Sequence, residues 1–149
     1  METTFAMIKP NAIQRGLAGE IISRFENKGL TISAMKMINV SEEQAKAHYK
    51  CHEGKSFYSN LLESITSGPV VCLAISGVNA IALVRHMAGA TNPLEALPGT
   101  IRGDYSADMR LNLIHTSDSE ENAKYELGIY FRDDEIVTTS KSLDPWIFS

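Results

Sequence analysis

The stretch Val70-Val71-Cys72-Leu73-Ala74-Ile75 is a continuous apolar run that directly follows the helix-ending pair Gly68-Pro69. An uninterrupted apolar run of this length is typical of a strand that is covered on both faces, because an exposed face would show alternating polar residues. The run is far too short to cross a bilayer as a helix. It therefore predicts a central strand within a sheet whose two faces are both covered.

Strand and helix patterns alternate on both sides of this run. Before it we expect strands at residues 4–9 and 31–40, and helices at residues 17–28, 41–50 and 57–67. After it we expect a helix that Asn79 caps and that ends at Gly89, a stiff loop at residues 90–104, a strand at 111–115 and a last helix opened by Ser117 and Glu120 as a capping box. This order allows a parallel doubly wound sheet or a ferredoxin-like split βαβ pair, and periodicity does not separate them.

The length, composition and charge of the chain limit the classes of function that it can have. A chain of 149 residues with 44% hydrophobic and 21% charged residues predicts one ordinary domain over residues 1–149. A net charge of −4 argues against general nucleic-acid binding, although cations gathered in one cleft can still bind a small polyanion. Two cysteines and no N-terminal signal pattern favour a reducing, cytoplasmic location.

The segment Asn112-Leu113-Ile114-His115-Thr116-Ser117-Asp118-Ser119 places a histidine where an apolar strand stops and a helix begins. A helix N-terminus attracts phosphate, and neutral imidazole beside a phosphate is a competent nucleophile. Glu126 on the same helix could fix the tautomer of His115. The alternatives are a histidine that is only a core or capping residue, or a Ser-His-Asp hydrolase; the absence of a G-x-S-x-G elbow disfavours the hydrolase.

Two further segments offer cations for phosphate. The loop from Thr91 to Asp104 is stiffened by prolines and contains Arg102, whose guanidinium suits phosphate geometry, and Lys9 ends the first strand immediately before a proline. Each cation taken alone is compatible with a purely structural role. No Walker A or kinase glycine-rich loop is present, so phosphoryl transfer here needs another architecture.

A metal site is a separate alternative for the end of the helix expected at residues 41–50. His48 and His52 lie four residues apart with Cys51 between them, but no fourth ligand follows at a familiar spacing. The sequence therefore favours a structural role for these residues over a zinc site.

Taken together, the motifs closely resemble those of nucleoside diphosphate kinases over nearly the whole chain. The matching stretches are Ile8-Lys9-Pro10-Asn11, Gln14-Arg15-Gly16-Leu17, His48-Tyr49, Ser67-Gly68-Pro69-Val70-Val71, Thr91-Asn92-Pro93, Pro98-Gly99-Thr100-Ile101-Arg102-Gly103-Asp104 and Asn112-x-x-His115-x-Ser117-Asp118-Ser119. The resemblance implies an α+β fold with a ferredoxin-like βαββαβ antiparallel sheet covered by helices. It also implies a cytoplasmic enzyme that forms a hexamer or, alternatively, a tetramer.

The resemblance implies a ping-pong reaction in which a nucleoside triphosphate gives its γ-phosphoryl group to Nδ1 of His115, and a nucleoside diphosphate then takes it. Glu126 would orient the His115 ring, and Lys9 and Tyr49 would complete the catalytic group. The nucleotide would be bound by Lys9 and Asn112 at the ribose, by Phe57 stacked on the base, and by Tyr49, Arg85, Thr91 and Arg102 at the phosphates. Stacking does not read the edge of a base, so base selectivity would be loose. Mg²⁺ would bind between phosphate oxygens of the nucleotide. Asp118 would be the nearest carboxylate and would contact the ion through a water molecule.

The chain departs from the family pattern at two positions. Leu111 stands where an arginine usually precedes the Asn112 match, and Arg110 is a candidate to replace that cation. Thr116 stands where a glycine often follows the histidine, which raises the question of whether the local backbone needs the freedom of glycine. Two rival functions are a ferredoxin-like binding module, which would lack a reactive histidine, and an inactive relative, which would be free to lose part of the site.

Overall fold

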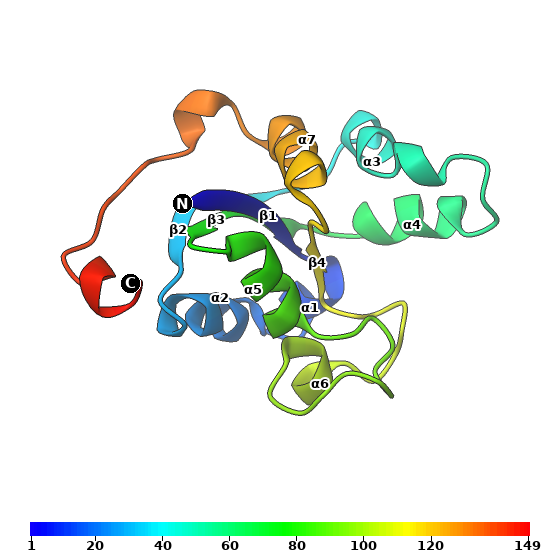
Figure 1. Cartoon of the computed structure of the whole chain (residues 1–149). Helices are drawn as coiled ribbons and strands as arrows, with labels where there is room; N and C mark the ends of the chain where they lie inside the picture. Colours follow the sequence, from blue (N-terminus) through cyan, green and yellow to red (C-terminus); the bar gives the residue numbers. More distant parts are fainter.

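The computed structural model describes residues 1–149 and contains one four-stranded antiparallel sheet in the order β2-β3-β1-β4 (Figure 1). The strands are β1 (Glu2–Ile8), β2 (Thr31–Ile38), β3 (Val70–Gly77) and β4 (Ile114–Thr116). The apolar run lies in β3, which pairs with β1 on one side and β2 on the other. Because β3 separates β1 from β2, the arrangement is the ferredoxin-like split βαβ pair, and the parallel doubly wound alternative is excluded.

The two faces of the sheet carry separate cores, as the period of two in a strand requires. On β1, Ala6 and Ile8 belong to one core, which α2 (Ala18–Asn27) and α5 (Ala80–Ala88) cover. Phe5 and Met7 point the other way, into a core covered by α3 (Glu42–His48), α4 (Tyr58–Ile65) and α7 (Glu120–Tyr130). Figure 1 shows these two helical layers below and above the sheet.

The helix caps confirm one prediction and correct two. Ser41 and Gln44 form the expected capping box of α3. The prediction for α7 was wrong, because Ser119 is the N-cap and accepts from the Asn122 N–H, while Ser117 lies outside the helix. Asn79 does precede α5, but its side chain makes no capping bond and its backbone is left-handed at φ 56°.

The segment expected to be a loop at residues 90–104 ends in a short helix, α6 (Ile101–Tyr105). Thr100 caps α6 by accepting from the Gly103 N–H at 3.0 Å. A side chain at Gly103 would collide with the Leu97 carbonyl, so the packing of this turn requires glycine there. Arg24 on α2 holds the turn by donating to the Asp104 carboxylate at 2.7 Å and to the Gly99 carbonyl. These contacts hold the segment against α2.

Short elements complete the chain. The helix α1 (Pro10–Gln14) follows β1 directly, with the 3₁₀ turns η1 (Lys50–His52), η2 (Asp133–Glu135) and η3 (Asp144–Trp146) further on. After α7 the tail returns to β2 and α2, where Ile147 packs against Gly29 and Phe148 lies over Gly77 (Figure 1). None of the helices combines the length and the apolar character that a membrane span needs.

Candidate active site

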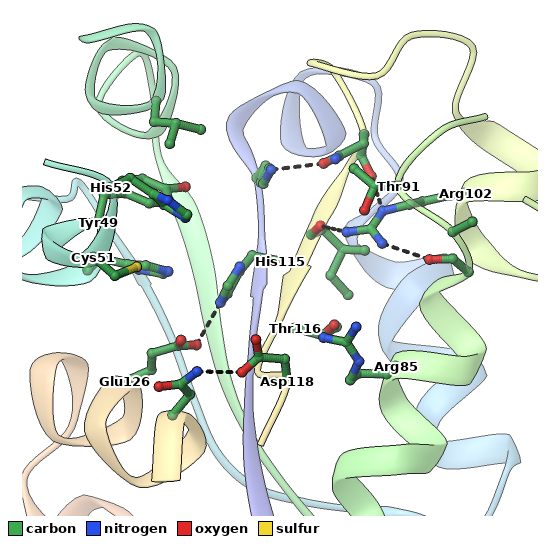
Figure 2. A pocket seen from close by; sticks show the side chains of 18 of the residues that line it. Tyr49, Cys51, His52, Arg85, Thr91, Arg102, His115, Thr116, Asp118 and Glu126 are labelled. Carbon is green, nitrogen blue, oxygen red and sulfur yellow. Dashed lines mark hydrogen bonds and ion pairs between the residues drawn. The ribbon is translucent and has the colours of Figure 1, made fainter. Parts of the chain in front are cut away.

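A cavity of about 410 Å³ opens where β1, β4, α3, α5 and α7 meet (Figure 2). Every residue predicted for the site lines this one cavity, although the ten residues come from widely separated parts of the chain. They are Lys9, Tyr49, Phe57, Arg85, Thr91, Arg102, Asn112, His115, Asp118 and Glu126.

His115 lies in the middle of β4, and its ring contacts Glu126 of α7. Its Nε2 lies 2.6 Å from Oε1 of Glu126, and the Ser117 hydroxyl donates to the same oxygen at 2.7 Å. Glu126 and Ser117 are buried, whereas the His115 side chain is 24% exposed. Since the carboxylate engages Nε2, that nitrogen carries the proton and the lone pair lies on Nδ1. Figure 2 shows the ring directed from Glu126 into the cavity.

This arrangement decides between the alternatives for His115. A histidine that only filled the core would not face a polar cavity. In a Ser-His-Asp triad the serine hydroxyl bonds to the histidine, whereas the Ser117 hydroxyl bonds to Glu126. The geometry supports a nucleophilic histidine, and Ser117 contributes by fixing the carboxylate that orients it.

His48 supports the His115 ring from the side of α3. The two rings meet edge to face with centroids 4.5 Å apart, and His48 Nδ1 lies 2.8 Å from the Tyr130 hydroxyl. Burial, together with the positive charge that His115, Lys9 and His52 can carry, lowers the pKa of His48 to about 2. His48 is therefore neutral at physiological pH, and its ring packs against that of His115 without adding a charge to the site.

His48, Cys51 and His52 do not form the cluster of ligand atoms that a zinc site would need. His48, His115 and Glu126 offer potential ligand atoms within 4.8 Å of one another, but Cys51 and His52 are not part of this group. His48 therefore belongs structurally to the His115 cluster rather than to its neighbours in sequence.

Lys9 and Asn112 form a pair on the cavity wall. The Lys9 ammonium donates to Oδ1 of Asn112 at 2.8 Å, which joins the end of β1 to the segment before β4. Burial, followed by the nearby charge of Arg102, lowers the pKa of Lys9 to about 8. Lys9 is thus a cation at neutral pH that can lose its charge under mildly alkaline conditions.

Arg102 is the most deeply buried cation of the site. Its guanidinium donates to the carbonyls of Gly89, Asn112 and Ile114 at 2.8, 3.3 and 2.6 Å. A guanidinium has five N–H donors, so two remain after these three bonds. Burial, with a contribution from Arg85, lowers its pKa to about 10, and it stays charged at neutral pH. Arg102 therefore ties three backbone segments together and still presents donors.

The remaining polar residues lie around the cavity, where Arg85, Thr91 and Asp118 are exposed and Tyr49 is buried. Arg85 projects from α5 without an ion pair, and Thr91 lies beyond the end of α5 (Figure 2). The Asn122 side-chain amide donates to Asp118 and is the main cause of its lowered pKa. Burial raises the pKa of Tyr49 to about 12, so its phenol stays protonated and can donate. These residues thus add one cation, two neutral hydrogen-bond donors and one ionised carboxylate to the cavity.

Comparison with known proteins agrees with this arrangement. The family model Nucleoside diphosphate kinase matches residues 2–136. The chain belongs to the nucleoside diphosphate kinase family. A nucleoside diphosphate kinase from Archaeoglobus fulgidus is 52% identical over 148 residues, which cover 99% of this chain and 98% of that protein. One from Carboxydothermus hydrogenoformans is 51% identical, with 99% of each chain covered.

Solved structures give the same family. The halophilic nucleoside diphosphate kinase from Halobacterium salinarum in complex with CDP has a TM-score of 0.96 at 43% identity, and 99% of each chain is covered. A nucleoside diphosphate kinase family protein from Babesia bovis also has a TM-score of 0.96, at 40% identity. These findings confirm the family, the ferredoxin-like fold and the enzyme class expected from the motifs.

Thr116, which stands where the family often has glycine, has an ordinary extended backbone. Thr116 is buried in β4 opposite Ala6 and is not among the residues with positive φ, so its backbone does not need glycine. The strain lies at Leu113 instead, with φ 77°. A bulky residue in this region costs about 1–3 kcal/mol. Complete burial of its side chain and a 2.8 Å bond from the Lys9 N–H to its carbonyl oppose that cost.

Two residues of the site were not predicted for the roles they have. Ser117 was assigned to the cap of the last helix, and His48 was considered as a possible metal ligand and as part of the His48-Tyr49 motif, without a contact to His115. The spacing of Ser117 two residues beyond His115 on a strand was an available signal, because it places both side chains on the same face. The contact between His48 and His115 spans distant parts of the chain and has no local signal.

Proposed function

We propose that this chain transfers the γ-phosphoryl group of a nucleoside triphosphate to a nucleoside diphosphate by a ping-pong reaction through phosphohistidine at Nδ1 of His115. The observation that carries the proposal is the 2.6 Å contact between His115 Nε2 and Glu126, which leaves Nδ1 as the nucleophilic nitrogen in a cavity lined by cations. A neutral imidazole has a free lone pair, so no separate base is needed.

In the first half-reaction the Nδ1 lone pair forms a bond to the γ-phosphorus. The bond from that phosphorus to the β,γ-bridging oxygen breaks, and its electrons leave with the nucleoside diphosphate. The ring becomes cationic while Nε2 keeps its proton, and the contact with the Glu126 carboxylate stabilises that charge. In the second half-reaction a terminal oxygen of another nucleoside diphosphate attacks the phosphorus and the P–N bond breaks. The same groups therefore serve both directions.

The chain's side chains would stabilise the loose transition state by position and charge. The binding set proposed for the phosphates consists of Tyr49, Arg85, Thr91, Arg102 and Lys9, which combine neutral and charged donors around one cavity. Lys9 and Asn112 would also bind the ribose hydroxyls, and Phe57 would stack on the base. The exposure of Phe57, at 44%, fits a ring that has room for a partner.

Mg²⁺ is the proposed cofactor, bound mainly through nucleotide phosphate oxygens, where it would neutralise phosphate charge. Asp118 suits a contact through water, because it is exposed and its lowered pKa keeps it ionised. Glu126 is already engaged by His115 and Ser117, whereas Asp118 accepts only from Asn122 through one oxygen and is the other carboxylate of the cavity.

We further propose a cytoplasmic homohexamer, with a tetramer as the alternative assembly. Large apolar side chains project from two segments: Leu94 and Leu97 from residues 90–104, and Trp146 from the tail, at 94%, 68% and 87% exposure. Exposed apolar groups of this size are typical of surfaces that bind another subunit. Both cysteines are free, which fits a reducing compartment.

The test is to incubate the protein with γ-³²P-labelled ATP and Mg²⁺ in the absence of an acceptor. We expect acid-labile, alkali-stable label on the wild type and on His86→Ala, a control histidine outside the cavity, and none on His115→Ala. Addition of a nucleoside diphosphate should move the label into triphosphate. A folded wild type that binds nucleotide but stays unlabelled would contradict the proposal.

A further inference from the structure

Three side chains at the floor of the His115 cavity hold potential metal ligands close together. His48, His115 and Glu126 each offer one nitrogen or oxygen atom, and these atoms all lie within 4.8 Å of one another. The residues come from α3, β4 and α7, and all three line the cavity, which gives an ion a route from solvent. Two imidazoles and one carboxylate, with a fourth position open to water, are a ligand set that protein zinc sites use.

His48 has a ring nitrogen that the fold leaves without a partner. The side chain is only 6% exposed, and its Nδ1 lies 2.8 Å from the Tyr130 hydroxyl, whereas its Nε2 is buried and makes no hydrogen bond. An unpaired buried polar atom is costly, so each one calls for an explanation. When Nδ1–H donates to Tyr130, Nε2 has a free lone pair, which is the form of histidine that binds a metal ion.

The other two ligands are already positioned beside each other. Nε2 of His115 lies 2.6 Å from Oε1 of Glu126, and Ser117 donates to that oxygen, so the carboxylate has the outer support that metal ligands usually have (Figure 2). Bonds to zinc are about 2.0–2.1 Å long, so a tetrahedral site separates its ligand atoms by roughly 3.3 Å. Rotations of the two rings and the carboxylate are therefore enough to close the group around an ion.

We infer that His48, His115 and Glu126 bind Zn²⁺ and that the bound ion blocks phosphorylation of His115. The block, unlike the binding, rests on the proposed function. A neutral imidazole has one proton and one lone pair on its two nitrogens. Zinc takes the lone pair of His115 Nε2 once the proton has moved to Nδ1, and no lone pair then remains on Nδ1 to attack the γ-phosphorus. Removal of the ion lets the proton return to Nε2 beside Glu126.

The ligand set separates zinc from the Mg²⁺ that the proposed reaction uses. Mg²⁺ prefers six oxygen ligands in octahedral geometry and keeps several waters, whereas two of the three atoms here are imidazole nitrogens. Imidazole suits the late first-row transition metals, of which Zn²⁺ accepts four ligands without a geometric preference of its own. We therefore expect zinc to bind this group in the presence of excess Mg²⁺.

The experiment is isothermal titration of ZnCl₂ into the nucleotide-free protein with excess Mg²⁺, for the wild type and three variants. His48→Asn keeps an amide for the Tyr130 hydroxyl but lacks Nε2, and Tyr130→Phe removes only the hydroxyl that holds the His48 ring. The matched control is the double variant Cys51→Ser, His52→Gln, which removes two zinc-binding side chains of the same cavity that lie outside the group. Circular dichroism and urea unfolding establish that each variant is folded.

We expect one zinc ion per chain in the wild type and in the double variant, with equal affinity. Tyr130→Phe should bind roughly tenfold more weakly, since loss of an outer partner costs about 10–100-fold, and His48→Asn should bind at least about 100-fold more weakly. Absence of zinc binding, equal affinity in a folded His48→Asn variant, or loss of binding in the double variant would overturn the inference.

The block is measured on zinc-loaded wild type from which free zinc has been removed. Mixing with γ-³²P-labelled ATP and Mg²⁺ should label His115 far more slowly than in the metal-free protein, and a chelator that strips the zinc should restore the rate. An unchanged rate in the loaded protein would overturn the block. A folded, metal-free wild type that takes no label would instead overturn the proposed function, whereas the titration would still decide the zinc site.

Discussion

The residues that hold His115 and the residues around Phe57 lie around two cavities that share part of their walls, but they differ sharply in burial and bonding. Glu126 and Ser117 are 8% and 1% exposed and both are hydrogen-bonded, whereas Phe57 and Met109 are 44% and 55% exposed. Buried bonded groups keep their geometry through the reaction, while exposed side chains can adapt to different partners. The end that we propose for phosphoryl transfer is therefore preorganised by buried hydrogen bonds, whereas the end that we propose for the base is exposed and adaptable.

The largest effect is expected from Glu126→Ala, which removes the buried carboxylate that contacts His115. Loss of the bond to His115 Nε2 frees the ring orientation and the tautomer, so we expect kcat to fall roughly 100-fold while the KM for the nucleotide changes little. Quenched-flow measurement of phosphohistidine formation checks this directly. Urea unfolding of the variant controls for loss of structure, and an unchanged rate in a folded variant would remove Glu126 from the mechanism.

Acid stability tests whether the buried end depends on a neutral His48. The pKa of His48 is lowered to about 2 in the folded protein, while the unfolded chain has its ordinary value near 6.5. Below pH 6.5 the unfolded state binds the extra proton, so stability falls as the pH falls. We expect the free energy of unfolding to be about 2 kcal/mol lower at pH 5 than at pH 7.5 from this group.

The control for this measurement is His48→Asn, whose amide can replace the contact with the Tyr130 hydroxyl but does not titrate. Urea unfolding of both proteins at the two pH values isolates the contribution of His48. If the variant lost as much stability between pH 7.5 and pH 5 as the wild type, the acid sensitivity would come from another group.

Phe57→Ala tests the role of the exposed aromatic ring that lines the cavity. Removal of the ring deletes a stacking surface without touching His115, so we expect KM to rise roughly tenfold for all nucleotides, because base stacking contributes about 1–3 kcal/mol. Steady-state kinetics with a purine and a pyrimidine diphosphate measures this. A large fall in kcat with unchanged KM would show that the two ends are not separable as described.

The smallest expected effect is a pH dependence of kcat/KM that comes from Lys9. This residue lines the cavity with both His115 and Phe57 and donates to Asn112. Because the pKa of Lys9 in the free enzyme is lowered to about 8, its charge is present below that pH and is lost above it. We expect kcat/KM to fall about fourfold at pH 8.5 relative to neutral pH. Lys9→Gln should show a low kcat/KM without this step, and a wild-type profile that is flat to pH 9.5 would contradict the assignment.

Local signals in the sequence were sufficient for most strands and helices and pointed to His115, Glu126, Lys9 and Arg102 as candidate site residues, whereas the other site residues came from the family resemblance. The apolar run of β3, the Ser41 capping box and the glycine after α5 each act within a few residues, so pattern alone located them. The strand order did not follow from pattern, because alternation of helices and strands is shared by several topologies. It came from the family resemblance, which the pairing of β3 with β1 and β2 confirms.

Features that depend on distant contacts were missed or misassigned. The serines near His115 satisfy the same capping pattern, and only the position of Glu126 after folding assigns Ser117 to the carboxylate and Ser119 to the cap. The strained backbone at Leu113 depends on its buried side chain and on the bond from β1. Single-sequence reasoning has no access to such contacts, because they exist only in the assembled fold.

The central claim is that Nδ1 of His115 carries the phosphoryl group between nucleotides. The most direct test is ³¹P NMR of protein labelled with ¹⁵N in its histidines, after reaction with ATP and Mg²⁺ and removal of free nucleotide. We predict one phosphoryl group per chain on Nδ1 of His115, which a nucleoside diphosphate discharges with formation of triphosphate. A phosphoryl group on Nε2, or on a residue other than His115, would contradict the account.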